Sequence, residues 1–162
     1  MRVPAATYRL QFNQRFRFED ARRLVPYLWA LGVTDLYASP ILQARQGSTH
    51  GYDVTDPARL NPELGGEKAF AALVESLQRH RMGLLLDIVP NHMAADTENP
   101  WWASVLQNGP DSPYTAYFDI DWHPPRPGLA NKVLLPVLSA PYGKELEDQK
   151  IAITLGEEGF TV

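Results

Sequence analysis

The most constraining stretch of this sequence is GLLLDIVPNHM, residues 83–93. Its apolar run has the length of a β-strand and is rich enough in large aliphatic residues to be buried on both faces of a parallel sheet. Asp87 interrupts the run, and Pro90 ends it because proline has no N–H to donate to a neighbouring strand. Asn91 and His92 follow at once. Polar side chains at the carboxyl end of a buried strand are how parallel α/β proteins form ligand sites.

Two strands and a helix are predicted at the start of the chain. Residues 5–12 alternate apolar and polar side chains with the period of a strand. The period becomes helical at Phe18, and Gly32 is the predicted stop signal. Residues 33–38 then form a second apolar strand. Strand, helix and strand in this order predict a parallel crossover unit.

A long connection follows the second strand. We expect residues 39–66 to be irregular, and irregular segments of this length are usually functional. A second amphipathic helix begins at Gly65-Gly66 and ends before Gly83. The resulting βαβαβ order predicts the start of a barrel or of a doubly wound sheet. The first strand is not followed by GxGxxG, which argues against dinucleotide binding.

Residues 94–162 differ in character from the rest. They are rich in proline, tryptophan and tyrosine and show no helical period of useful length. Residues 131–139 and 150–155 are predicted as short strands. We therefore expect an irregular insertion with a small sheet. Because the sequence stops in what looks like the middle of another strand, we expect the chain to be a fragment.

Composition excludes several classes of function. The net charge is −4 and no basic run is present, which argues against a general nucleic-acid binder. The absence of cysteine excludes disulfides and thiolate metal sites. No apolar segment approaches the roughly 20 residues that span a bilayer, and the first residues lack the apolar core of a secretory signal. A cytoplasmic protein without membrane contact is the expectation.

The long connection contains a second group of candidate site residues, in GSTHGYDVTD (47–56). Tyr52 and Asp53 suit a sugar clamp, since a tyrosine ring stacks on a pyranose and a carboxylate accepts bonds from its hydroxyls. The alternative is an Asx-turn aspartate beside a tyrosine that anchors the loop.

The same carboxylates and histidines suggest a metal only weakly. Asp53, Asp56 and Asp87 carry oxygen ligands, but they do not have the regular spacing of an EF-hand loop. His50 and His92 lack the spacing of a zinc motif. No metal or other cofactor is expected.

These motifs resemble the α-amylase superfamily, glycoside hydrolase family 13. DIVPNH is similar to the first conserved motif of that superfamily, at the end of the third barrel strand, and HGYD is similar to its tyrosine-aspartate pair in the loop after the second strand. The segments ATYRLQFN, ASPILQARQGSTHGYDV and NKVLLPVLSAPYGKELE resemble the trehalose-forming branch.

The resemblance implies a fold. Residues 1–93 would be the first three β/α units of a TIM (β/α)₈ barrel. Residues 94–162 would be the truncated start of a domain inserted after the third strand.

The resemblance also implies a reaction. The full-length enzyme would convert the reducing-end α-1,4 linkage of a maltooligosaccharide to an α,α-1,1 linkage by a retaining mechanism. It would act as an isomerase by intramolecular glucosyl transfer and would be a monomer. The nucleophile and the general acid would lie beyond Val162, so this chain would hold no catalytic residue and would be inactive alone.

The resemblance assigns substrate binding to Tyr52, Asp53 and His92. Tyr52 would stack under the sugar at the reacting subsite, Asp53 would support that clamp, and His92 would bond a sugar hydroxyl. Asp87 would orient the nucleophile and an arginine of the fourth strand, beyond this chain. Asn91 and His50 would support the site, and the position of Asn91 binds calcium in many amylases.

Two other functions stay open. One is a hydrolytic α-amylase or another glucanotransferase of the superfamily. The other is a carbohydrate-binding module without catalysis, which would need a compact closed domain.

Overall fold

The computed structural model describes residues 3–126, 128–135, 138–156 and 159–161. The chain divides into two compact units, Met1–Phe118 and Asp119–Val162, which are described separately. None of the described helices is long and apolar enough to cross a membrane.

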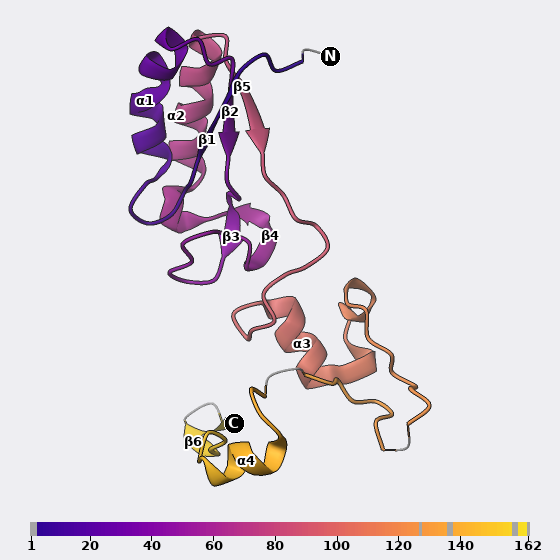
Figure 1. Ribbon diagram of the computed structural model, residues 1–162. Helices are drawn as coiled ribbons and strands as arrows, with labels where there is room; N and C mark the ends of the chain where they lie inside the picture. The colour runs from indigo at the N-terminus through magenta and orange to yellow at the C-terminus, as the bar shows by residue number, and fades with distance from the viewer. Residues whose placement is uncertain (1–2, 127, 136–137, 157–158, 162) are drawn as a thin grey trace. The chain divides into compact units, whose positions relative to one another are not determined.

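The first unit is built on a parallel sheet of three strands. β1 (Thr7–Leu10), β2 (Asp35–Ala38) and β5 (Gly83–Leu86) lie side by side in that order, as Figure 1 shows. The register aligns Arg9 with Tyr37 and Tyr37 with Leu85. The predicted order and parallel direction of the three strands are confirmed.

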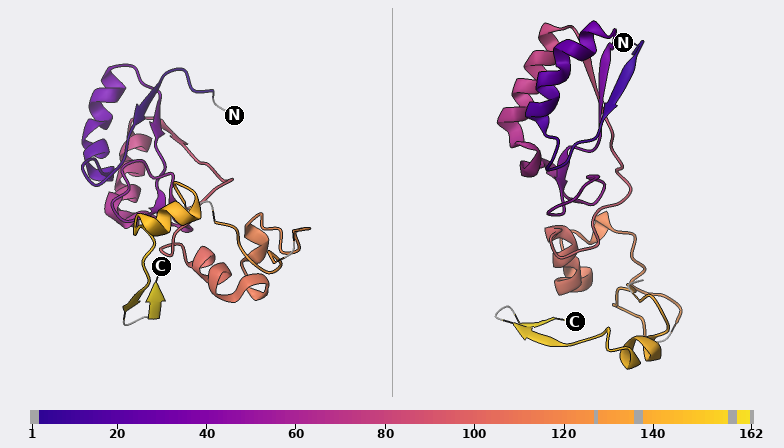
Figure 2. Two further views of the ribbon diagram at one scale, coloured as in Figure 1. Left: turned by 60° about the horizontal axis from the view of Figure 1, so that its bottom comes forward. Right: turned by 60° about the vertical axis from the view of Figure 1, so that its left-hand side comes forward.

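Two helices cover one face of this sheet, as the right-hand view of Figure 2 shows. α1 (Phe18–Ala30) and α2 (Gly66–Arg79) both fall within the predicted helical ranges. Apolar residues recur every three or four positions in each helix, so each presents one apolar face to the sheet. Their buried residues pack with β1 and β2 in a single core cluster, which includes Phe18, Val25, Leu28, Leu36, Leu73 and Leu77.

The start of α1 is fixed locally. The N–H of Arg17 donates to the carboxylate of Asp20 over 2.9 Å, which satisfies a backbone donor just before the first turn. Glu19 pairs with Arg22 over 2.7 Å, and this bond lowers the pKa of Glu19 to about 2. Acidic residues in the first turn also stabilise the helix, because their negative charge interacts favourably with the positive end of the helix dipole.

In the part of the chain that the structure describes, the third strand is covered on one face only. Leu85 is 37% exposed and Leu86 is 47% exposed. β5 is an edge of the sheet, and the two helices that pack on the sheet cover only one of its faces. The strand also ends at Leu86, so Asp87 follows it directly.

The connection between residues 39 and 66 is more regular than predicted. β3 (Leu42–Ala44) and β4 (Val54–Leu60) form an antiparallel pair, and a 3₁₀ turn (Pro62–Leu64) precedes α2. The register of the pair shifts twice, which marks bulges. This irregularity removes the clean period of two that would have revealed the strands in the sequence.

The prediction that residues after 94 lack helix is also wrong. α3 (Pro100–Asn108) is capped by Asn99, whose side chain accepts bonds from the N–H groups of Trp101 and Trp102. A side-chain cap followed by proline at the first helical position is a strong start signal. Two 3₁₀ turns, Gly109–Asp111 and Thr115–Tyr117, follow it.

The second unit contains α4 (Tyr142–Glu147) and an antiparallel pair, β6 (Thr154–Gly156) and β7 (Gly159–Thr161). The predicted strand over 131–139 does not form in its described residues, and residues 136–137 lie outside them. The strand predicted over 150–155 begins only at Thr154.

Inside α4, Glu145 is buried. Its carboxylate accepts a 2.7 Å bond from Ser139 and pairs with Lys150 over 3.3 Å. The hydrogen bond from Ser139 is the main cause of the lowered pKa of Glu145, and the contact with Lys150 adds to it. Burial acts in the opposite direction.

Candidate functional site

The candidate site centres on Asp87, directly after β5. The hydroxyl of Tyr52 donates to its Oδ2 over 2.7 Å, although the two residues are 35 positions apart. The hydroxyl of Tyr37 donates to the same oxygen over 3.2 Å. The side chain of Asp87 is only 14% exposed, so these bonds largely replace its hydration. The structure thus brings Tyr52 and Asp87, predicted from separate motifs, into direct contact.

Sequence reasoning missed the cation of this cluster, Arg9. One of its terminal nitrogens donates to Asp87 Oδ2 and to the Tyr52 hydroxyl, each over 3.2 Å. Its guanidinium also lies over the Tyr37 ring, 5.4 Å from the centroid. Asp87 thus has an arginine partner within this chain, and its pairing with an arginine of the fourth strand stays a prediction.

The strand register explains the meeting of these residues. Arg9, Tyr37 and Leu85 are aligned across the sheet, so their side chains point to one face. Asp87 lies two residues after Leu85 and keeps that face. This is the face away from α1 and α2, since the neighbouring Leu36 belongs to the core cluster beneath the helices.

The electrostatics fix the charge state of each group. The bond from Tyr52, aided by Arg9 and Tyr37, lowers the pKa of Asp87 although partial burial opposes it. The bond to Asp87 raises the pKa of Tyr52, so its hydroxyl stays protonated. Burial lowers the pKa of Arg9, but the bonds to Asp87 and Tyr52 outweigh it and raise the value. At its centre the cluster therefore holds a carboxylate, a guanidinium and the protonated phenol of Tyr52.

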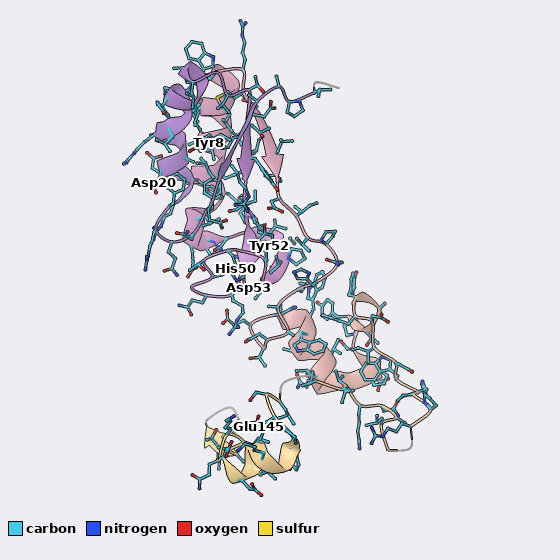
Figure 3. The ribbon with its side chains drawn as sticks, viewed as in Figure 1. Tyr8, Asp20, His50, Tyr52, Asp53 and Glu145 are labelled. Carbon is cyan, nitrogen blue, oxygen red and sulfur yellow. The ribbon has the colours of Figure 1, made fainter. Side chains whose placement is uncertain are left out.

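The loop between β3 and β4 presents Tyr52, and His50 supports it. The Tyr52 N–H donates to His50 Nδ1 over 3.0 Å, and the two rings stack with centroids 5.9 Å apart. Figure 3 shows His50, Tyr52 and Asp53 together on this loop, beyond the ends of the parallel strands. Gly51 has a φ of +77°, and a Cβ there would lie 2.9 Å from the Pro40 carbonyl oxygen. The loop thus needs glycine beside Tyr52.

Asp53 stabilises the loop from within. Its carboxylate accepts the Ser48 hydroxyl, and its carbonyl oxygen accepts the N–H of Arg45 over 3.0 Å. The His50 ring nitrogen lies 3.8 Å from the same carboxylate. The role predicted for Asp53, which is to support the clamp and bind the sugar, stays a prediction.

His92 and Asn91 lie in the segment after β5, and both are exposed. The Ala94 N–H donates to the Val54 carbonyl over 2.8 Å, which ties this segment to the chain two residues after Tyr52. Arg45 pairs with Asp96 over 2.9 Å and holds the same segment to the loop. His92 therefore lies two residues before Ala94, which bonds directly to the region of Tyr52. The contact of His92 with a sugar stays a prediction.

A metal centre finds no support in this cluster. Among the residues that the structure describes, no three His, Asp or Glu side chains gather closely enough to hold an ion. Asp53 and Asp87 each accept bonds from hydroxyl groups instead. What the arrangement offers is an aromatic ring held beside a half-buried, ionised carboxylate, which suits a polyhydroxylated ligand.

One signal could have found Arg9 in the sequence. Arg9 stands between Tyr8 and Leu10 in the first strand, so its side chain points to the face of the sheet opposite to theirs. A largely desolvated carboxylate such as Asp87 requires a partner on the same face. Whether Arg9 lies close enough to Asp87 to be that partner depends on the register between the strands. Neither segment alone shows this register.

Comparison with known proteins agrees with this fold. Residues 22–145 match the family described as alpha amylase, catalytic domain. A putative maltooligosyl trehalose synthase of Mycobacterium tuberculosis is 46% identical over 83% of this chain and 18% of its own length. An intracellular maltogenic amylase of Bacillus subtilis is 37% identical over 60% of this chain and 16% of its own length.

Solved structures give the same result. Maltooligosyltrehalose synthase from Arthrobacter ramosus matches 98% of this chain and 20% of its own chain, with 41% identity and a TM-score of 0.82. A second maltooligosyl trehalose synthase structure matches 98% of this chain and 21% of its own chain, with 38% identity and a TM-score of 0.82.

The chain spans about a fifth of the length of these synthases. The family match covers most of the chain, and its parallel strands with helices on one face are part of a TIM barrel. The chain therefore belongs to the α-amylase family, within whose catalytic domain residues 22–145 fall.

Proposed function

We propose that the complete protein converts the reducing-end α-1,4 linkage of maltooligosaccharides to an α,α-1,1 linkage, and so forms a trehalose terminus. The observation that carries this proposal is the similarity to two synthase structures, each over 98% of the chain. The Tyr52–Asp87 contact supports it, because it presents an aromatic ring at the end of the sheet where TIM-barrel enzymes bind substrate.

In the proposed reaction, the bond between the last two glucose units breaks as a carboxylate attacks the anomeric carbon. A carboxylic acid protonates the departing oxygen. The released glucose stays bound, turns over, and attacks the glucosyl-enzyme through its own anomeric hydroxyl. The proton of that hydroxyl returns to the carboxylate that acted as acid. Both carboxyl groups belong to later barrel strands, outside this chain.

The residues of this chain would bind and orient the sugar. Tyr52 would stack on the ring that receives the nucleophile, and the ionised Asp87 would place negative charge where positive charge develops at that ring. His92 would donate to a hydroxyl of the same sugar. Asp53 and His50 would hold the loop, and Asn91 would shape the segment that carries His92.

The same proposal extends to the domains. Residues 1–93 would be the first three β/α units of the barrel, and residues 94–162 the start of an insertion after its third strand. The complete protein would be a cytoplasmic monomer. The parallel order β1, β2, β5 and the change of architecture after β5 support this division.

Product analysis with maltopentaose tests the proposed function. The complete enzyme should remove reducing ends at a rate that far exceeds the release of free glucose or maltose. New reducing ends and free small sugars in equal amounts would contradict the proposal. That result would favour the alternative function, a hydrolase, which the 37% identity to a maltogenic amylase keeps open.

A further inference from the structure

We infer that Arg9 is a positioning residue of this site, which holds the Tyr52 hydroxyl and the Asp87 carboxylate in one arrangement before a sugar binds. The inference rests on the proposed function only in that the site must bind an α-glucan. It does not depend on whether the product is a trehalose terminus or a hydrolysed chain.

The contacts of Arg9 connect three elements. From β1, it reaches Asp87 after β5 and Tyr52 on the β3–β4 loop, each over 3.2 Å. Its other terminal nitrogen donates to the Gln11 side chain over 2.9 Å. Gln11 donates in turn to the Thr49 carbonyl over 3.3 Å and to the His50 carbonyl over 3.4 Å. The pair Arg9 and Gln11 thus anchors the loop on both sides of Gly51.

The geometry calls for a guanidinium. Two terminal nitrogens in one rigid plane bind different acceptors at fixed angles, while the plane lies over the Tyr37 ring. A lysine ammonium is a point charge on a flexible stem and cannot hold the same directions. Charge alone would therefore preserve only part of the arrangement.

Arg9 also sets the charge of the cluster. The described groups bonded to Asp87 are Arg9, Tyr37 and Tyr52, and Arg9 is the cation among them. Without it, the carboxylate keeps two neutral donors, and its pKa rises. A loss of Arg9 should then show in the pH dependence of the reaction as well as in its rate.

The test compares Arg9→Gln and Arg9→Lys with the control Arg23→Gln in the complete enzyme. Arg23 also contacts a carboxylate, Glu19, over 3.2 Å, but it lies on the outer side of α1 and is exposed. We expect Arg9→Gln to lower kcat/KM for maltopentaose by about 10–100-fold, with a rise in KM of at least about fivefold. Arg9→Lys should recover part of the loss, and Arg23→Gln should match the wild type within about twofold.

The pH profile separates positioning from a merely structural role. In Arg9→Gln, the acidic limb of kcat/KM should move to higher pH, because the carboxylate of Asp87 has lost its cation. A rate within about twofold of the Arg23→Gln control would overturn the inference. A large loss of rate with an unmoved acidic limb would also overturn it, since it would assign Arg9 to folding alone.

Binding of reduced maltopentaose provides a readout without turnover, measured by calorimetry. Its reduced end cannot undergo isomerisation, so the measurement reports only the site. Arg9→Gln should weaken binding at least about fivefold relative to Arg23→Gln, and equal affinities would contradict the inference. Failure of the proposed function would appear differently, as hydrolysis products from the wild-type enzyme.

Discussion

Gly51 provides the sharpest test of how the loop positions Tyr52, because the chain contains a matched control. Gly47 and Gly51 share a φ of +77°, so alanine at either position meets the same backbone strain. At Gly47 the nearest atom to an added Cβ is a side-chain nitrogen 3.9 Å away, which is an ordinary van der Waals contact. At Gly51 the added Cβ would lie 2.9 Å from the Pro40 oxygen and 3.2 Å from its Cβ.

The two variants should differ by the steric term alone. Left-handed backbone in a non-glycine residue costs about 1–2 kcal/mol, which is the whole effect expected for Gly47→Ala. Pro40 is buried and cannot yield, so Gly51→Ala should add about 1–3 kcal/mol of overpacking or displace the loop. Displacement of the loop would lengthen the 2.7 Å bond from Tyr52 to Asp87.

Thermal unfolding and kcat/KM for maltopentaose measure the two consequences. Gly51→Ala should have the lower midpoint and should lose about 10–100-fold in kcat/KM, whereas Gly47→Ala should lose less than about threefold. Equal effects of the two substitutions would refute the reasoning, because the contact with Pro40 would then have no part in placing Tyr52.

Three other predictions follow from the site. Tyr52→Phe keeps the ring and loses the bond to Asp87, so kcat/KM should fall about 5–30-fold, whereas Tyr52→Ala should fall at least tenfold further; equal losses would exclude stacking. His92→Ala should lower kcat/KM by roughly 10–1,000-fold, and an unchanged value would remove His92 from the site. The pKa of Asp87 is lowered in the folded protein, so the pairing of this carboxylate stabilises the fold at pH values above its unfolded pKa of about 3.9. This stabilisation is lost as the pH falls through the folded pKa. The stability difference between wild type and Asp87→Asn should therefore shrink in unfolding curves between about pH 5 and pH 2, and a constant difference would exclude this linkage.

A further prediction concerns these 162 residues expressed alone. Their parallel sheet has two open edges, and Leu85 is exposed on the face opposite the helices. Open edges and exposed apolar side chains favour aggregation. We expect an inactive product without cooperative unfolding. A sharp thermal transition of the purified monomer, with dispersed amide signals in NMR spectra, would contradict this expectation.

Periodicity in the sequence predicted the elements with strong local signals. α1 and α2 have clear apolar faces, and the three parallel strands have short apolar or alternating runs. The β3–β4 pair was missed because its bulges disturb the alternation. α3 was missed because nine residues give few repeats of a helical period, although Asn99 and Pro100 marked its start.

The candidate site was predicted in part for a similar reason. Tyr52 and Asp87 each belong to a motif that resembles the family, so their importance was visible before their contact. Arg9 belongs to no such motif, and its role follows from the register that aligns it with Tyr37. Long-range register is a property of the packed sheet and is weakly encoded in any single segment.

The most direct test of the account is a crystal structure of the complete enzyme with reduced maltopentaose bound. The account predicts a glucose ring stacked on the face of Tyr52 at roughly 4 Å, with Asp87 still bonded to Tyr52 and Arg9. A sugar bound away from Tyr52, with this cluster outside the glucan site, would contradict it.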